Sequence, residues 1–169
     1  MAEGEKISPS ELGKRVAILR RFKELLKAQR DRFEAYLNAL DRQRDVIERG
    51  TTDDLLRHVE LEEKIVTDIF SIQKVIDPLE KMYQDTRTAF PAKAKAAMVK
   101  DSGDDEIISL KEALNSLKTE AAIRSGQNRE LLAKRMADLR SEIKSLRSSA
   151  YTNRRANASL EPSLVDLKG

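Results

Sequence analysis

The chain has 169 residues, of which 36% are charged and only 4% aromatic, and its formal net charge is +3. It contains no cysteine, which excludes disulfides, thiolate metal sites and a cysteine nucleophile. Glycine and proline are scarce, at 6 and 4 residues. This composition favours long, solvated helices with a narrow apolar seam over a compact globule.

The first eight residues are polar and include Glu3 and Glu5, unlike a secretion signal. No segment approaches the roughly 18 consecutive apolar residues that a membrane-spanning helix needs. We therefore expect a soluble, cytoplasmic protein with a single helical domain over residues 1–150.

The first predicted helix covers residues 9–49. It begins at a capping box formed by Ser8 and Glu11, with Pro9 at the first helical position. Apolar residues then recur every seven positions, at Leu12, Leu19, Leu26, Phe33, Leu40 and Ile47. Phe22, Leu25 and Tyr36 widen this row. The pattern predicts a coiled-coil-like seam.

The second predicted helix covers residues 52–90. Gly50 ends the first helix and Thr51 or Thr52 caps the second, so the short connection predicts antiparallel neighbours. The second seam is Leu55, His58, Glu62, Ile65, Ile69, Ile72, Ile76, Leu79, Tyr83, Thr86 and Phe90. Pro78 lies within this seam without changing its phase, which predicts a kink and not a domain boundary.

The charges of these two helices are equal and opposite. Residues 10–50 carry 11 basic and 7 acidic side chains, whereas residues 52–90 carry 5 basic and 9 acidic ones. The resulting net charges of +4 and −4 favour two helices that pair with each other over a basic surface for nucleic acid.

The third predicted helix covers residues 104–150. Its seam is Ile107, Leu110, Leu114, Leu117 and Ala121, followed after eleven residues by Leu132, Met136, Leu139, Ile143, Leu146 and Ala150. The eleven-residue step is a stutter, and Gly126 within it weakens the helix by about 1 kcal/mol relative to alanine. The two halves are therefore expected to face different partners. Residues 151–169 lose the periodicity, and we expect them to form a flexible tail.

Few side chains offer catalytic or metal-binding chemistry. His58 is the single histidine and has no obvious metal-ligand partners, so a structural role in the seam is favoured. Acidic clusters occur at Asp53–Asp54, at Glu60, Glu62 and Glu63, and at residues 104–106; the helix macrodipole explains the two at helix starts. We therefore expect no enzyme activity, no metal and no cofactor.

The second half of the third helix carries a continuous apolar face, formed by Leu131, Leu132, Met136, Leu139, Ile143 and Leu146. This face either packs into the core or captures an amphipathic segment of another protein. The pattern alone leaves both interpretations open.

A resemblance to a known family favours capture. The sequence Gln127-Asn128-Arg129-Glu130-Leu131-Leu132 resembles a motif of the FlgN-type flagellar type III export chaperones, in which an asparagine is followed shortly by a leucine pair and by apolar residues at helical spacing. Tyr151 occupies the place of a typical tyrosine beyond that helix, and residues 164–168 resemble the aliphatic and basic ending of many members. The resemblance covers roughly residues 12–168. Thr152 stands where a glycine usually follows the tyrosine.

The resemblance implies a cytoplasmic chaperone. It would bind C-terminal amphipathic segments of hook–filament junction proteins, the hook-associated proteins of the FlgK and FlgL type, prevent their premature self-association and deliver them to the export gate. The implied cargo-binding residues are Asn128, Leu131, Leu132, Met136, Leu139, Ile143 and Leu146. Tyr151 would contact an export-gate membrane protein of the FlhA type, although packing of its ring onto the helix is an open alternative.

Two other classes of function compete with this one. A structural coiled-coil scaffold or assembly subunit would use the same seams between chains, and a homodimer is compatible with them. A basic helical nucleic-acid binder is the weaker alternative, and its affinity would fall steeply with salt.

Overall fold

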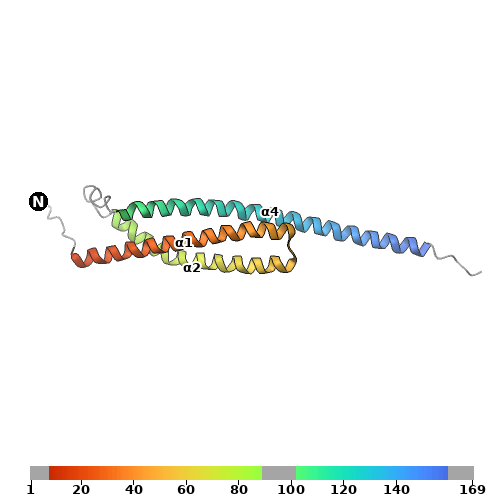
Figure 1. Cartoon of the computed structure of the whole chain (residues 1–169), viewed down its shortest axis with the longest axis horizontal. Helices are drawn as coiled ribbons and strands as arrows, with labels where there is room; N and C mark the ends of the chain where they lie inside the picture. Colours follow the sequence, from red (N-terminus) through yellow and green to blue (C-terminus); the bar gives the residue numbers. More distant parts are fainter. Residues whose placement is uncertain (1–7, 89–101, 160–169) are drawn as a thin grey trace, which may run out of the picture. The chain divides into compact units, whose positions relative to one another are not determined.

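The computed structural model describes residues 8–88 and 102–159, and all the regular structure within these ranges is helical. The helices are α1 (Pro9–Arg49), α2 (Thr52–Thr88) and α4 (Ser102–Ser159) (Figure 1). The predicted all-α, three-helix fold is confirmed. The chain divides into two units, Met1–Asn128 and Arg129–Gly169, and α4 contributes to both.

The capping groups at the first two helices lie where the sequence predicts them. The Ser8 hydroxyl accepts from the backbone N–H of Glu11 at 3.2 Å. At the start of α2, Thr51 and Asp54 form a reciprocal pair in which each side chain accepts from the other's backbone N–H, both at 3.1 Å. Thr51 is therefore the cap.

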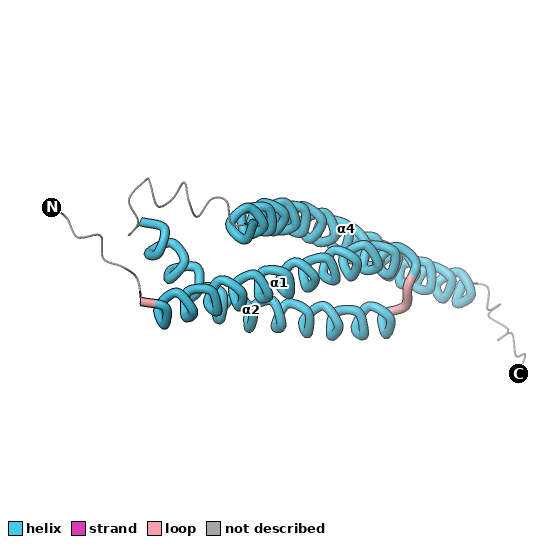
Figure 2. The backbone as a smooth tube through the Cα atoms, turned by 60° about the vertical axis from the view of Figure 1, so that its left-hand side comes forward, coloured by secondary structure: helices cyan, strands magenta, loops and turns pink. Residues whose placement is uncertain are grey.

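Residue 50, between α1 and α2, must be a glycine because the backbone of Val46 lies very close to it. Its backbone is extended and its N–H donates to the Val46 carbonyl at 2.8 Å. A Cβ at this position would lie 2.6 Å from the Val46 carbonyl oxygen, which is closer than van der Waals contact allows. The tight connection, visible as the short loop in Figure 2, therefore depends on glycine.

The first unit is a bundle in which α2 runs antiparallel to α1 and α4 runs parallel to it. Side-chain pairs between α1 and α2 rise in residue number on α1 and fall on α2: Arg32 binds Asp68 at 3.5 Å, and Gln43 binds Glu62 at 2.5 Å. Ion pairs between α1 and α4 rise in residue number on both helices, from Lys23–Glu106 at 3.1 Å to Asp41–Arg124 at 2.9 Å, as parallel helices require. The expected antiparallel pairing of the first two helices is confirmed.

The core of the bundle is widest where all three helices meet. The buried residues of its main cluster are Phe22, Leu25, Leu26, Ile76, Tyr83, Ile107, Leu110 and Leu114. Phe22 and Ile107 are 0% exposed, and the Phe22 and Tyr83 rings lie 5.4 Å apart. A second cluster contains Leu37, Leu40 and Ala121. Phe22, which the heptad row treats as a flanking residue, is thus at the centre of the core.

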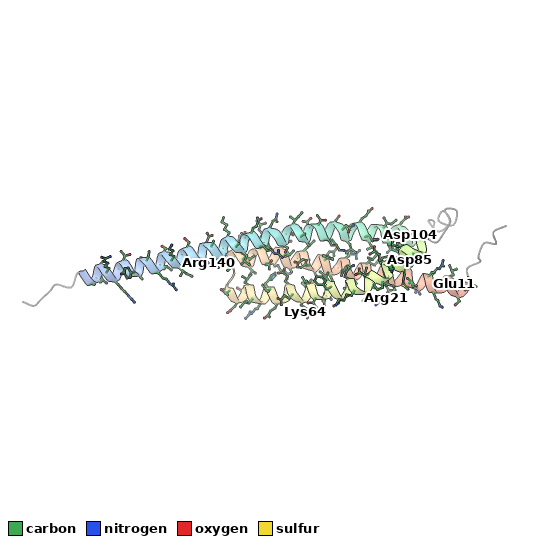
Figure 3. All side chains as sticks on the ribbon, turned by 180° about the vertical axis from the view of Figure 1, so that it is seen from behind. Glu11, Arg21, Lys64, Asp85, Asp104 and Arg140 are labelled. Carbon is green, nitrogen blue, oxygen red and sulfur yellow. The ribbon has the colours of Figure 1, made fainter. Side chains whose placement is uncertain are left out.

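Pro78 lies inside α2, and the seam continues across it. Ile76 is buried in the main cluster and Leu79 packs against the same cluster. Figure 1 shows the end of α2 turning toward the first turns of α4, as expected for a kink in this region. The Tyr83 hydroxyl donates to the Asp104 carboxylate there, and Figure 3 shows Asp85 and Asp104 at the same end of the bundle.

Two predicted boundaries are wrong. Helix α4 begins at Ser102, two residues early, and continues to Ser159, so residues 151–159 are helical and do not belong to a flexible tail. Loss of apolar periodicity does not break a helix, and residues 151–159 contain no glycine or proline to do so. The predicted end of the second helix at residues 89–90, the proposed turns at 92–100 and the rest of the tail, 160–169, lie outside the described residues.

Candidate binding surface

The apolar face in the second half of α4 is solvent-exposed. Leu139 is 42% exposed and Leu146 is 65% exposed, with Met136 and Ile143 between these values. Leu131 and Leu132 are half-buried. We call Met136, Leu139, Ile143 and Leu146 the exposed face. Four large apolar side chains at helical spacing on one open face form a typical docking surface for an amphipathic helix.

Asn128 is placed differently from the other candidate cargo-binding residues. It is 6% exposed, and its Nδ2 donates to the Leu40 carbonyl at 2.8 Å and to Gln43 Oε1 at 3.0 Å. The structure therefore places Asn128 in the interior of the bundle and separates it from the exposed face. A buried amide with both bonds satisfied fixes the position of α4 against α1.

Asn128 is the last member of a polar chain that links all three helices. Glu62 on α2 accepts from the Tyr36 hydroxyl at 3.3 Å and from Gln43 Nε2 at 2.5 Å. Gln43 in turn accepts from Asn128. These hydrogen bonds explain why a glutamate, Glu62, occupies a position of the α2 seam. The spacing of residues along α2 does not reveal its partners, because they lie on other helices.

Tyr151 is neither at the end of the third helix nor packed onto it. The helix continues past it to Ser159, and Tyr151 is 70% exposed. The alternative in which its ring packs back onto the helix is therefore wrong. An exposed aromatic ring with a polar tip remains available to a partner.

The structure also explains the residues considered for chemistry. His58 is buried, and its Nε2 donates to the Ala39 carbonyl at 2.5 Å; a carbonyl only accepts, so Nε2 carries the proton. This is a helix–helix contact. Across residues 8–88 and 102–159, no three histidine or acidic side chains gather as a metal site would require.

Two carboxylates at helix starts have lowered pKa values. Hydrogen bonds from Lys27, at 2.6 Å, and from Lys23 hold the pKa of Glu106 below its ordinary value. The Thr51 backbone N–H, followed by its hydroxyl, lowers the pKa of Asp54. Asp54 therefore serves in capping α2, and Glu106 serves in pairing α4 with α1. These hydrogen bonds and ion pairs act beside the helix macrodipole by which the sequence pattern explains the two clusters.

A second apolar row, which the predicted seams do not include, lies on α2. It comprises the exposed residues Leu56, Val59 and Phe70 and the half-buried Val66, with Glu63 between them, and we call it the outer stripe. Its spacing of three and four residues repeats that of the buried seam, offset by one residue, or about 100° around the helix. The sequence contains this signal, but the stronger seam of isoleucines masks it.

The described helices are too polar along their lengths for any of them to span a bilayer. No family model matches the chain, and no solved structure matches it. A protein of Treponema pallidum (strain Nichols), described as an uncharacterized protein, is 31% identical over 147 residues, which cover 87% of this chain and 86% of the relative. A match of this extent spans both units, and the chain belongs to the same family as this Treponema pallidum protein.

Proposed function

We propose that the protein is a cytoplasmic export chaperone that captures the C-terminal amphipathic segment of a flagellar hook–filament junction protein and delivers it to the type III export gate. The observation that carries this proposal is the exposed face. The cargo-binding residues implied by the resemblance to FlgN-type chaperones include the four residues of this face. Binding, and not catalysis, is the proposed activity.

The chemistry of the exposed face suits a helical cargo. Its residues lie three or four positions apart, so they form one continuous strip that accepts the apolar strip of a second helix. Arg140 and Arg147 lie beside this strip at a spacing of seven residues, which places both on the same side of the helix. A cargo helix with acidic residues next to its apolar strip is therefore favoured.

The direct test is binding to the C-terminal segment of a junction protein from the same organism, measured by calorimetry. Leu139→Asp places a charge in the exposed face and should weaken binding at least tenfold, because a charge buried in an apolar interface is costly. Circular dichroism should show unchanged helix content and melting, since Leu139 is exposed. Ser141→Asp, on the opposite side of the same helix, is the matched control and should bind as the wild type does.

Delivery to the gate is tested separately with Tyr151→Ala. This variant should keep cargo affinity and melting temperature and lose affinity for the cytoplasmic part of the export-gate protein. Wild-type gate binding by Tyr151→Ala would refute the docking role of Tyr151. Wild-type cargo binding by Leu139→Asp would refute the chaperone proposal itself.

A further inference from the structure

The outer stripe of α2 forms an apolar hollow that the bundle does not use. Phe70 is 64% exposed, although it is the largest apolar side chain on this side of α2. A hollow of about 450 Å³ is lined by Val59, Glu62, Glu63, Val66, Thr67 and Phe70. The seam of α2, which contains His58, Ile65 and Ile76, is buried instead. A surface of this kind stays exposed only at a cost, which a partner helix would remove.

The hollow has acidic surroundings, because Glu62 and Glu63 line it and Glu60 follows the lining residue Val59; we call Glu60 and Glu63 its rim. Within the described residues, the carboxylates of Glu60 and Glu63 have no ion-pair partner, and both side chains are exposed. The Glu62 carboxylate, in contrast, accepts hydrogen bonds from Tyr36 and Gln43. Helix α2 as a whole carries 9 acidic and 5 basic residues. A helix that fits this hollow should therefore be basic beside its apolar strip.

The second half of α4 has these properties. Residues 129–159 contain 8 basic and 3 acidic side chains. In the part of the chain that the structure describes, Arg140 and Arg147 beside the exposed face have no ion-pair partner. Arg140 is labelled on this helix in Figure 3.

The two strips also match in length and spacing. Positions 56, 59, 63, 66 and 70 of α2, of which 63 is the glutamate within the stripe, span fourteen residue steps. The exposed face spans the same number of steps when it is extended to the half-buried Leu132. Each strip alternates steps of three and four residues over about 21 Å, at 1.5 Å per residue. Two helices with the same alternation over the same length can interdigitate along their whole contact.

We propose that the exposed face of α4 in one copy of the protein docks on the outer stripe of α2 in a second copy. The apolar strips remove each other from water, and Arg140 and Arg147 neutralise the rim formed by Glu60 and Glu63. The contact uses the face to which the proposed function assigns cargo, so cargo and the second copy compete for it. The association itself requires no cargo and is tested with the full chain alone.

The experiment is sedimentation of the full chain over a range of concentrations. Wild type should associate reversibly, and more weakly as salt is raised. Phe70→Ser should weaken association about tenfold, because it removes the largest apolar side chain of the outer stripe. Val75→Ser, which removes another exposed apolar side chain, 46% open to solvent, from the opposite side of α2, should have no effect.

Charge reversal provides the second measurement. Glu60→Arg with Glu63→Arg should weaken association, as should Arg140→Glu with Arg147→Glu, and the combined variant should recover it. Lys134→Glu, on the opposite side of α4, is the charge control. A chain that stays monomeric at all concentrations, or association lost in Leu139→Asp but retained in Phe70→Ser, would overturn the proposal. Phe70→Ser should still bind cargo, so the two proposals fail independently.

Discussion

The two halves of α4 carry the same apolar spacing and have opposite surroundings. In residues 102–128, Ile107, Leu110 and Leu114 are buried among α1 and α2. In residues 129–159, the equivalent residues Leu139, Ile143 and Leu146 are open to solvent. An amphipathic pattern therefore predicts that a helix has a face to cover, but it does not identify what covers it. That difference separates the structural part of this helix from the part proposed to bind partners.

The strongest test of this comparison is truncation of a buried seam residue. Ile107→Ala should lower the free energy of unfolding by about 2–5 kcal/mol, because it leaves a cavity between three helices. Urea denaturation followed by circular dichroism measures the loss. A loss below about 1 kcal/mol would show that the first half of α4 packs as loosely as the second.

Asn128 marks the end of the buried half, and its removal should have an intermediate effect. Asn128→Ala leaves Gln43 without its donor inside the bundle and should cost about 1–3 kcal/mol of unfolding free energy. Gln127→Ala, which removes the neighbouring exposed amide, is the control and should change little. Equal stability of the two variants would contradict the anchoring role of Asn128.

The ion pairs of Glu106 should make the stability of the buried half depend on pH. Because the pKa of Glu106 is lower in the folded than in the unfolded chain, its contribution is present above the unfolded pKa and is lost as pH falls through the folded one. Glu106→Gln should therefore be less stable than wild type at pH 7, with the difference shrinking below about pH 4. Thermal melts across this range measure it, with Glu112→Gln as the exposed control. A difference that persists in acid would contradict the ion-pair explanation.

The smallest effect on stability is expected in the exposed half. Leu139→Ala should change the free energy of unfolding by no more than about 0.5 kcal/mol, because no packed contact is lost. Measured at low protein concentration, where association is negligible, it provides the direct counterpart of Ile107→Ala. A loss of several kcal/mol would mean that the exposed face is covered within the single chain.

Much of the fold can be predicted from the sequence, because capping boxes and heptad rows are local signals. Ser8, Gly50 and Thr51 mark helix ends that the structure confirms. The burial of Gln29 could not be predicted: its Nε2 donates to the Ile69 carbonyl and to Gln73, both 3.1 Å away on the facing helix. Such partners are known only once two helices are in register.

The sequence predicts which apolar residues form the candidate site, but it does not predict which of them are exposed to solvent. Leu139 and Leu114 are indistinguishable by spacing, and Asn128 falls within the same motif as Leu131 and Leu132 although it is buried. Burial depends on whether a second helix reaches the same level of the bundle, which is a property of the packed chain. For the same reason the outer stripe around Phe70 can be distinguished from the isoleucine seam only in the packed bundle, where the seam is buried and the stripe is not.

Because α4 is one uninterrupted helix, its buried half supplies a nucleus for the exposed half. Starting a helix in water is unfavourable, whereas extending one costs little for each added residue. Residues 129–159 extend hydrogen-bonded turns that the bundle already holds in place, with Asn128 fixing the last of them. A partner arriving at Leu139 or Ile143 therefore meets a preformed strip and orders little backbone on binding. Amide hydrogen exchange along α4 should slow progressively from Ser159 toward Asn128, since fraying proceeds from the free end.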